Sequence, residues 1–344
     1  MISSRVASTP QRTTNDFVRW QPLATFPVCC EIRSSHLEVL QRVQKLFAAS
    51  PSATTPIVEG EADAVWRWEI EADGDLWRAC DLETNIVFDG ELERVLTNIE
   101  YSIVQRLVDM VKNKPTPFFA MHAALLHKNG FGLIVVGPSE SGKSTLSCGF
   151  WRSGWQLLSD DFCFFKSGDT TQYRVFPARR RASLRDGSRA IVGEELWHAI
   201  ENAPSSFRTS EGWIFHPHEI ASDNEISPQN PLPASVRINA IVFLGRRDQN
   251  QNPDDAPILQ PLAPTRAAFA LLPYCSLLSR DEATAQNNVS EHRVLDWGAA
   301  LPRIAPWVEQ ARVYTLQRAA LPHMLAAVES LRAADVDTKQ WENA

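Results

Sequence analysis

The stretch Phe131–Ser144, FGLIVVGPSESGKS, decides the fold predicted for this chain. Its first part, Phe131–Val136, is a continuous apolar run, which is typical of a strand buried on both faces. Gly137–Ser144 follows at once and fits the spacing G-x-x-x-x-G-K-[ST] of a phosphate-binding loop. Residues 145–152 then have the pattern of a helix that ends at Gly154. A strand, this loop and a helix in that order predict a binding site for a nucleoside triphosphate.

The residues of this loop have separate expected roles. Glycines allow backbone N–H groups to curl around an anion, and the N-terminus of the following helix adds partial positive charge. Lys143 is expected to reach the transferable phosphate, and Ser144 to ligate Mg²⁺. The residues predicted to bind the nucleotide are Gly137, Ser139, Ser141, Gly142, Lys143, Ser144 and Thr145.

Two adjacent aspartates, Asp160 and Asp161, interrupt the apolar run 155–165, WQLLSDDFCFF, which is predicted to be another buried strand. Burying two carboxylates is costly unless a cation or strong donors compensate, and Mg²⁺ at the phosphate loop would do so. Because side chains alternate along a strand, the two aspartates have separate roles or the strand ends there. One would hold the metal and the other would accept the proton of an incoming hydroxyl. A plain loop-capping aspartate is the structural alternative.

Further candidates lie on either side of this region. His122 is on a strand predicted over 120–126 that would form a hairpin with Phe131–Val136. Taken alone, it is more typical of a core histidine than of a catalyst. The arginines after a returning strand at 172–176 form either a clamp for a phosphate or an acidic substrate, or a solvated basic turn. These arginines are Arg179, Arg180, Arg181 and Arg185.

The rest of the chain supplies supporting elements. Helices are predicted over 36–49, 92–111, 264–272 and 321–333, and strands or hairpins over 64–88, 238–244 and 312–316. Residues 200–235 and 246–258 are predicted to be loops. The predicted organisation is a flexible leader at 1–25, an N-terminal α+β region at 26–114, a nucleotide-binding domain at 115–335 and a flexible tail at 336–344.

Composition limits the partners. A net charge of −7 and a pI near 5.7 argue against a general nucleic-acid binder. The six cysteines form no CxxC pair and are expected to be buried thiols. The stretch His216–Glu219, HPHE, lacks a further ligand at metal-site spacing, so no structural metal is expected there. With no secretory signal and no apolar run of about 20 residues, we expect a cytoplasmic protein without a membrane partner.

The block Met121–Phe165 resembles the HPr kinase/phosphorylase family and its looser relatives. Three features match together: a histidine at the start of the hairpin, a loop of the form G-x-S-x-x-G-K-S, and an Asp-Asp pair after a helix that ends in glycine. The resemblance implies a mixed-sheet α/β fold akin to the C-terminal domain of phosphoenolpyruvate carboxykinase. It also implies that Asp161 is the general base, that Asp160 belongs to the metal site and that His122 is an active-site residue.

Two departures from the family limit what the resemblance implies. HPr kinase/phosphorylases carry an acidic residue where this chain has Thr145, and their downstream Glu-Arg-Gly signature is not found here. The resemblance therefore leaves open both a phosphorylase activity and HPr as the acceptor.

These features predict an ATP-dependent, Mg²⁺-requiring kinase that phosphorylates a hydroxyl on a serine-like acceptor, which is a protein, a peptide or a small molecule. The first alternative is a nucleotide-binding module that regulates a partner with little catalysis. The second is a P-loop ATPase such as a transporter subunit, although the chain has no LSGGQ-like segment. The acceptor and the oligomeric state, homo-oligomer included, stay open.

Overall fold

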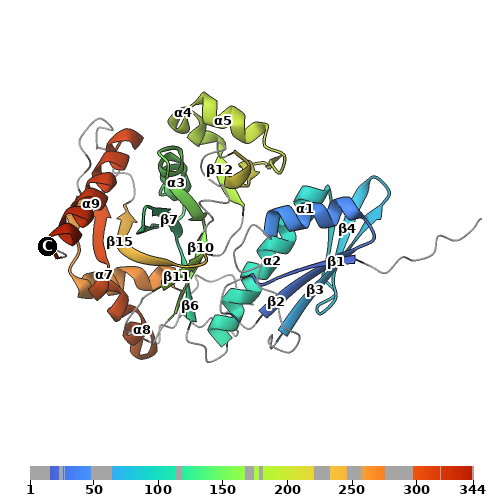
Figure 1. Ribbon diagram of the computed structural model, residues 1–344, viewed down its shortest axis with the longest axis horizontal. Coiled ribbons are helices and arrows are strands. Elements are labelled where there is room, and N and C mark those ends of the chain that lie inside the picture. Colours follow the sequence, from blue (N-terminus) through green and yellow to red (C-terminus); the bar gives the residue numbers. More distant parts are fainter. Residues whose placement is uncertain are drawn as a thin grey trace, which may run out of the picture. The chain divides into compact units, whose positions relative to one another are not determined.

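In the computed structural model, the apolar run Phe131–Val136 is strand β8, inside a nine-stranded sheet (Figure 1). All six of its residues are buried. It pairs in parallel with β15 (Val236–Leu244) on one side and antiparallel with β7 (Ala124–Lys128) on the other. The prediction of a strand buried on both faces is confirmed.

The structure describes residues 16–22, 26, 28–47, 64–113, 118–166, 174–177, 181–220, 233–245, 257, 259–275, 297–317 and 319–342. The chain separates into two units, residues 1–98 and 99–344, and each unit is described by itself. This division falls inside helix α2 (Leu92–Asn113), whereas the sequence suggested a boundary after residue 114.

The large sheet of the second unit is mixed, so the α/β class with a mixed sheet is confirmed. Its order is β6-β10-β11-β15-β8-β7-β9, and β17 adds to β15 in parallel and to β16 antiparallel. The other strands of this sheet are β6 (Phe118–His122), β9 (Gln156–Ser159), β10 (Phe162–Lys166), β11 (Arg174–Pro177), β16 (Leu259–Pro261) and β17 (Arg312–Leu316).

Helices cover both faces of this sheet. Alternate residues of β8 enter two separate cores: Ile134 joins the side chains of α7 and α8, and Leu133 joins those of α3, α5 and α9. This burial on both sides explains why β8 shows no polar alternation. The helices are α3 (Lys143–Arg152), α5 (Glu194–Glu201), α7 (Pro264–Leu271), which continues as η3 (Leu272–Tyr274), α8 (Trp297–Gln310) and α9 (Leu321–Glu342).

A smaller sheet of order β12-β14-β13 lies in the same unit. The prediction of an irregular loop from residue 200 to 235 is wrong where the structure describes it, because most of this sheet comes from that segment. Short strands of two to four residues leave too little periodicity to detect in a sequence. The elements are β12 (Ala182–Arg185), η2 (Asp186–Ser188), α4 (Arg189–Val192), β13 (Phe207–Arg208), β14 (Gly212–Phe215) and α6 (Pro217–Ile220).

The first unit contains a five-stranded sheet of order β1-β2-β3-β4-β5. The predicted meander over 64–88 is confirmed as β3, β4 and β5, with the turn at Gly74. Strand β1 is a correction, since it lies within the segment expected to be a flexible leader. The elements are β1 (Asp16–Trp20), β2 (Val28–Ser34), α1 (Leu37–Phe47), β3 (Ala64–Asp73), β4 (Leu76–Asp81) and β5 (Val87–Gly90).

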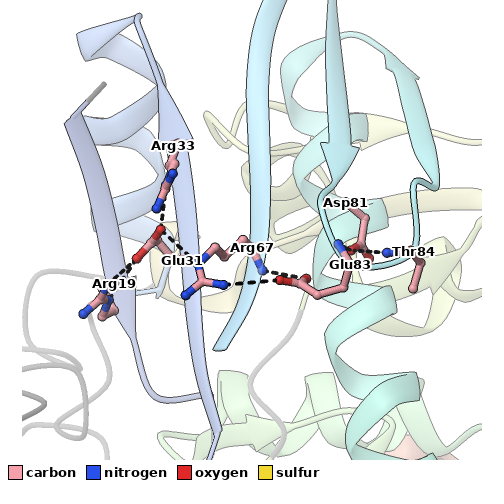
Figure 2. Close-up of polar contacts among 7 residues, drawn as sticks. All are labelled: Arg19, Glu31, Arg33, Arg67, Asp81, Glu83 and Thr84. Carbon is pink, nitrogen blue, oxygen red and sulfur yellow. Dashed lines mark hydrogen bonds and ion pairs between the residues drawn. The ribbon is translucent and has the colours of Figure 1, made fainter. Parts of the chain in front are cut away.

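One carboxylate of this sheet is fully buried among arginines (Figure 2). Glu31 on β2 accepts hydrogen bonds from Arg19 Nε at 3.0 Å and Arg33 Nε at 2.7 Å, and Arg67 Nε lies 3.6 Å away. Burial acts to raise the pKa of Glu31, but the bonds from Arg19 and Arg33 outweigh it and hold that pKa below its usual value. We call these four residues the Glu31 cluster.

The remaining expectations concern the C-terminus, the cysteines and the membrane. Helix α9 runs to Glu342, so the predicted flexible tail is helical over most of its length. None of the six cysteines, which all lie among the described residues, forms a disulfide bond, and five of them are buried. In the part of the chain that the structure describes, no helix combines the length and the apolarity needed to cross a bilayer.

Candidate functional site

Two predicted strands are each broken, and the breaks bring His122 and the aspartates together. The run 120–126 divides between β6 and β7 at Ala123, and the run 155–165 divides between β9 and β10 at the aspartates. The expectation that His122 lies on the partner strand of β8 is therefore wrong. It ends β6, which pairs with β10 instead, opposite Phe162.

Pairing of β6 with β10 places His122 directly beside Asp161. His122 Nε2 lies 2.6 Å from Asp161 Oδ1, and the Ala123 N–H donates to the Asp161 carbonyl at 2.9 Å. Both side chains are partly exposed, at 40% and 29%. A backbone hydrogen bond thus holds the two residues together, and their side chains are accessible to solvent.

The segment Gly137–Ser144 leaves the end of β8 and leads into α3. Gly142 caps this helix with a φ of 93°, a value that favours glycine. Gly137 is enclosed, since an added Cβ would lie 2.7 Å from Ser141 Oγ and 2.8 Å from the Leu244 carbonyl oxygen. Glycine is needed at both positions for this path of the backbone.

Lys143 lies at the start of α3 and is folded over the loop. Its Nζ donates to the Gly137 carbonyl at 2.9 Å and to the Pro138 carbonyl at 3.3 Å. Burial lowers the pKa of Lys143, although the nearby Asp161 and Asp160 oppose this shift. An anion at the loop would favour the charged ammonium and would raise that pKa again.

The next residue, Ser144, meets the first aspartate. Ser144 Oγ donates to Asp160 Oδ2 at 3.1 Å, and the Ser183 N–H approaches the same oxygen at 3.4 Å. Asp160 is only 7% exposed, so this carboxylate sits in a buried setting with a hydroxyl beside it. Two such oxygen donors are ligands that Mg²⁺ accepts together with phosphate and water.

Two further hydroxyls belong to this region. Thr145 Oγ1 and Ser188 Oγ lie 2.9 Å apart, which joins α3 to η2. Ser141 Oγ is buried and has no hydrogen-bond partner among the residues that the structure describes. Such a buried hydroxyl costs free energy unless a ligand or a water satisfies it.

These side chains surround one cavity of about 410 Å³, which is within the usual size range of small-molecule sites. Most of the predicted site residues line it, whereas Gly137 and Ser141 are not part of the lining. Its lining consists of His122, Ser139, Glu140, Gly142, Lys143, Ser144, Thr145, Asp160, Asp161, Arg181, Ser183, Leu184, Arg185, Gly187, Ser188 and Ile191.

The four predicted clamp arginines have different settings. Arg185 Nη1 donates to Glu140 Oε1 at 2.5 Å and its Nη2 lies 3.3 Å from Glu211. Its guanidinium is half-exposed at the cavity, and the bond to Glu140 raises its pKa. Arg181 contributes to the lining, but its guanidinium points into a buried cluster with Glu100. Arg179 and Arg180 lie outside the described residues.

Sequence reasoning missed Ser183 and Ser188, because isolated serines in short elements carry no recognisable pattern. It also missed Glu100, which lies on the buried face of α2. His216 of the HPHE stretch bonds Glu100 with an Nε2–Oε1 distance of 3.1 Å. Within the described ranges, no group of three or more His, Cys, Asp or Glu side chains is placed to hold a metal ion.

Comparison with known proteins gives a short sequence match. The chain matches no protein-family model. Over 59 residues it is 32% identical to HPr kinase/phosphorylase 1 of Oceanobacillus iheyensis, which is 17% of this chain and only 19% of that protein. The match supports an HPr-kinase-like relationship.

A solved structure, the HPr(Ser) kinase/phosphatase of Coxiella burnetii, aligns with 64% of this chain and 98% of its own chain. The alignment has a TM-score of 0.31 and 12% identity.

Proposed function

We propose that this protein is an ATP-dependent, Mg²⁺-requiring kinase that transfers a phosphoryl group to a hydroxyl. One observation carries the proposal: a single cavity is lined by a lysine at a helix N-terminus, by the Ser144–Asp160 pair, and by Asp161 in contact with His122. These are a phosphate site, a metal site and a candidate base, which phosphoryl transfer to a hydroxyl requires together.

The loop residues fit a triphosphate. Gly137 has no room for a Cβ, and Ser141 Oγ is buried without a partner in the described part of the chain. Lys143 Nζ donates to the loop carbonyls of Gly137 and Pro138. In the proposal Lys143 turns from these carbonyls to the β- and γ-phosphates. The amides of Ser139, Ser141, Gly142, Ser144 and Thr145 complete the binding site.

Ser144 and Asp160 fit a divalent cation beside the phosphates. Mg²⁺ prefers one or two carboxylate or hydroxyl ligands with the remaining positions taken by phosphate and water. When bound, the ion would neutralise the charge that develops on the transferred group. Ser144 and Asp160 would hold it from the protein side.

Asp161 is the proposed base. The acceptor oxygen forms a bond to the γ-phosphorus while the bond to the β-phosphate oxygen breaks, and the hydroxyl proton passes to the Asp161 carboxylate. His122, at 2.6 Å, keeps this carboxylate in place. The resemblance to HPr kinases favours a serine-like acceptor and a carboxykinase-like arrangement of the domain, and both are part of the proposal.

Labelled ATP tests the proposal. The purified protein, with Mg²⁺ and γ-labelled ATP, is incubated with lysate of its own source, and the labelled product is identified. We expect a labelled hydroxyl ester that disappears with Lys143→Ala. ATP binding without transfer to any acceptor would contradict the kinase and would favour the regulatory module. Rapid phosphate release without an acceptor would favour the ATPase.

A further inference from the structure

A second charged cluster lies in the 99–344 unit, apart from the proposed reacting groups. Glu100 comes from α2, Arg181 precedes β12 and His216 follows β14, and their side chains are 3%, 1% and 7% exposed. Arg181 Nε lies 3.5 Å from Glu100 Oε1, and the Arg181 N–H donates to Glu100 Oε2 at 3.3 Å. We call these three residues the Glu100 cluster.

The cluster keeps a carboxylate charged inside the protein. Burial acts to raise the pKa of Glu100, but His216 and then Arg181 outweigh it, so that pKa lies below its ordinary value. A buried ion pair adds little net stability relative to apolar packing, whereas removing one partner is strongly unfavourable. The structural effect of the Glu100 cluster is therefore to fix the positions of the three segments that carry Glu100, Arg181 and His216.

What the Glu100 cluster specifies is the start of β12. In this strand Ala182 and Leu184 are buried in the core on the α3 side, and the alternate residues Ser183 and Arg185 are exposed and line the cavity. Arg181 stands one residue before the strand. Since Glu100 binds both its backbone N–H and its guanidinium, it fixes the point from which β12 runs into the site.

The same cluster also fixes the segment on the other side. Arg181 Nη1 donates to the Ser205 carbonyl at 3.0 Å, and the Ser205 N–H donates to Glu219 Oε2 at 2.7 Å. His216 directly follows β14, the strand that pairs with β12 along its whole length. Both strands are therefore anchored at the same end by one carboxylate.

We propose that Glu100 is a positioning residue that holds β12 so that the Ser183 N–H meets Asp160, the carboxylate assigned above to Mg²⁺. The inference rests on the proposed function of that site. Ser183 N–H and Ser144 Oγ approach the same oxygen, Asp160 Oδ2, from two elements. A shift of β12 would leave Ser144 in place and would remove only the Ser183 N–H from Asp160. It should therefore weaken Mg²⁺ binding more than triphosphate binding.

The test uses the full chain with Glu100→Gln and a matched control, Glu329→Gln. Glu329 also has a lowered pKa and bonds Lys128, Trp155 and Arg332, but it lies on α9 and outside the cavity lining. Two quantities are measured: the Kd of a fluorescent ATP analogue without Mg²⁺, and the Mg²⁺ concentration at half-saturation. His216→Gln provides a second variant if Glu100→Gln fails to fold.

We expect Glu100→Gln to raise the required Mg²⁺ concentration about 10- to 100-fold, the usual effect of losing a group that orients a metal ligand, and to change the Mg²⁺-free Kd little. Hydrogen exchange at residues 182–185 should become faster in this variant and not in Glu329→Gln. An unchanged Mg²⁺ requirement, or equal weakening with and without Mg²⁺, overturns the inference alone. Failure of the unaltered protein to bind the analogue overturns the proposed function instead.

Discussion

Lys143 combines burial with a charge that the proposed function uses. Its ammonium is held by two carbonyls, and burial depresses its pKa. The charged form of a lysine with a lowered pKa is lost at a lower pH than that of an exposed lysine, which titrates near pH 10.4. In the proposed function, the protonation of Lys143 is thus linked to triphosphate binding.

We predict that triphosphate binding takes up protons at alkaline pH, below the ordinary lysine pKa near 10.4, because the bound phosphates restore the charge of Lys143. Affinity should fall as the pH rises through this range. Isothermal titration calorimetry in two buffers with different heats of ionisation measures the uptake. Lys143→Met should remove it. Equal heats in both buffers for the unaltered protein would contradict this role.

Asp160 and Asp161 are adjacent in the chain and have different surroundings. Asp160 is bonded to Ser144 and buried, whereas Asp161 contacts His122 and is partly exposed. We predict that Asp161→Asn lowers single-turnover transfer about 10²- to 10⁴-fold with an unchanged Kd for ATP. Asp160→Asn should raise the Mg²⁺ requirement. Similar kinetics for the two variants would rule out the division of roles.

At the scale of elements, the loop between β8 and α3 depends on close approach of the backbone. We predict that Gly137→Ala lowers the stability of the fold by about 1 to 3 kcal/mol, because its Cβ would meet the Leu244 carbonyl at 2.8 Å. ATP affinity should fall with it. The matched control is Gly245→Ala, whose nearest neighbour would be 3.7 Å away. Thermal unfolding and ATP titration measure stability and ATP affinity for both variants. Equal losses in Gly137→Ala and Gly245→Ala would contradict the prediction.

The Glu31 cluster lies in the five-stranded sheet of the first unit (Figure 2). A carboxylate with a lowered pKa stabilises the fold above its unfolded pKa, near 4.3, and this contribution is lost as the pH falls through the folded pKa. We predict that Glu31→Gln costs about 1.5 to 3 kcal/mol at pH 7 and much less at an acid pH below the folded pKa of Glu31.

Urea unfolding at both pH values measures this difference. Asp89→Asn, which removes an exposed partner of Arg78, serves as the control and should have little effect at either pH. A loss for Glu31→Gln that is the same at pH 7 and at acid pH would show that packing, and not charge, is responsible.

On the scale of the whole molecule, every residue of the cavity lies in the 99–344 unit. The fragment 92–344 retains all of α2 and Glu100, whereas the fragment 115–344, which begins at the predicted boundary, loses both. We predict that 92–344 binds ATP as the full chain does and that 115–344 needs about 10- to 100-fold more Mg²⁺. Fluorescence titration measures both, after circular dichroism confirms folding. A folded 92–344 fragment that does not bind would show that the site needs the first unit.

Local sequence determined a large part of this protein. Phe131–Val136 has no polar alternation because both faces of β8 are buried, and α1, α2 and α7 show the helical period of one buried face. The helix that follows β8 was predicted, although α3 begins at Lys143, two residues before the predicted start. These features depend on residues within a few positions of one another.

Only the tertiary structure decided which distant residues meet. His122 contacts Asp161 because β6 pairs with β10 and not with β8, and Arg181 contacts Glu100 across 81 positions of the sequence. The short strands β12, β13 and β14 carry too few residues for a period. Strand order and the pairing of separated segments depend on the packing of the whole unit, which no local pattern records. Local sequence determined the turn between β8 and α3, and the tertiary structure decided which side chains line the cavity beside it.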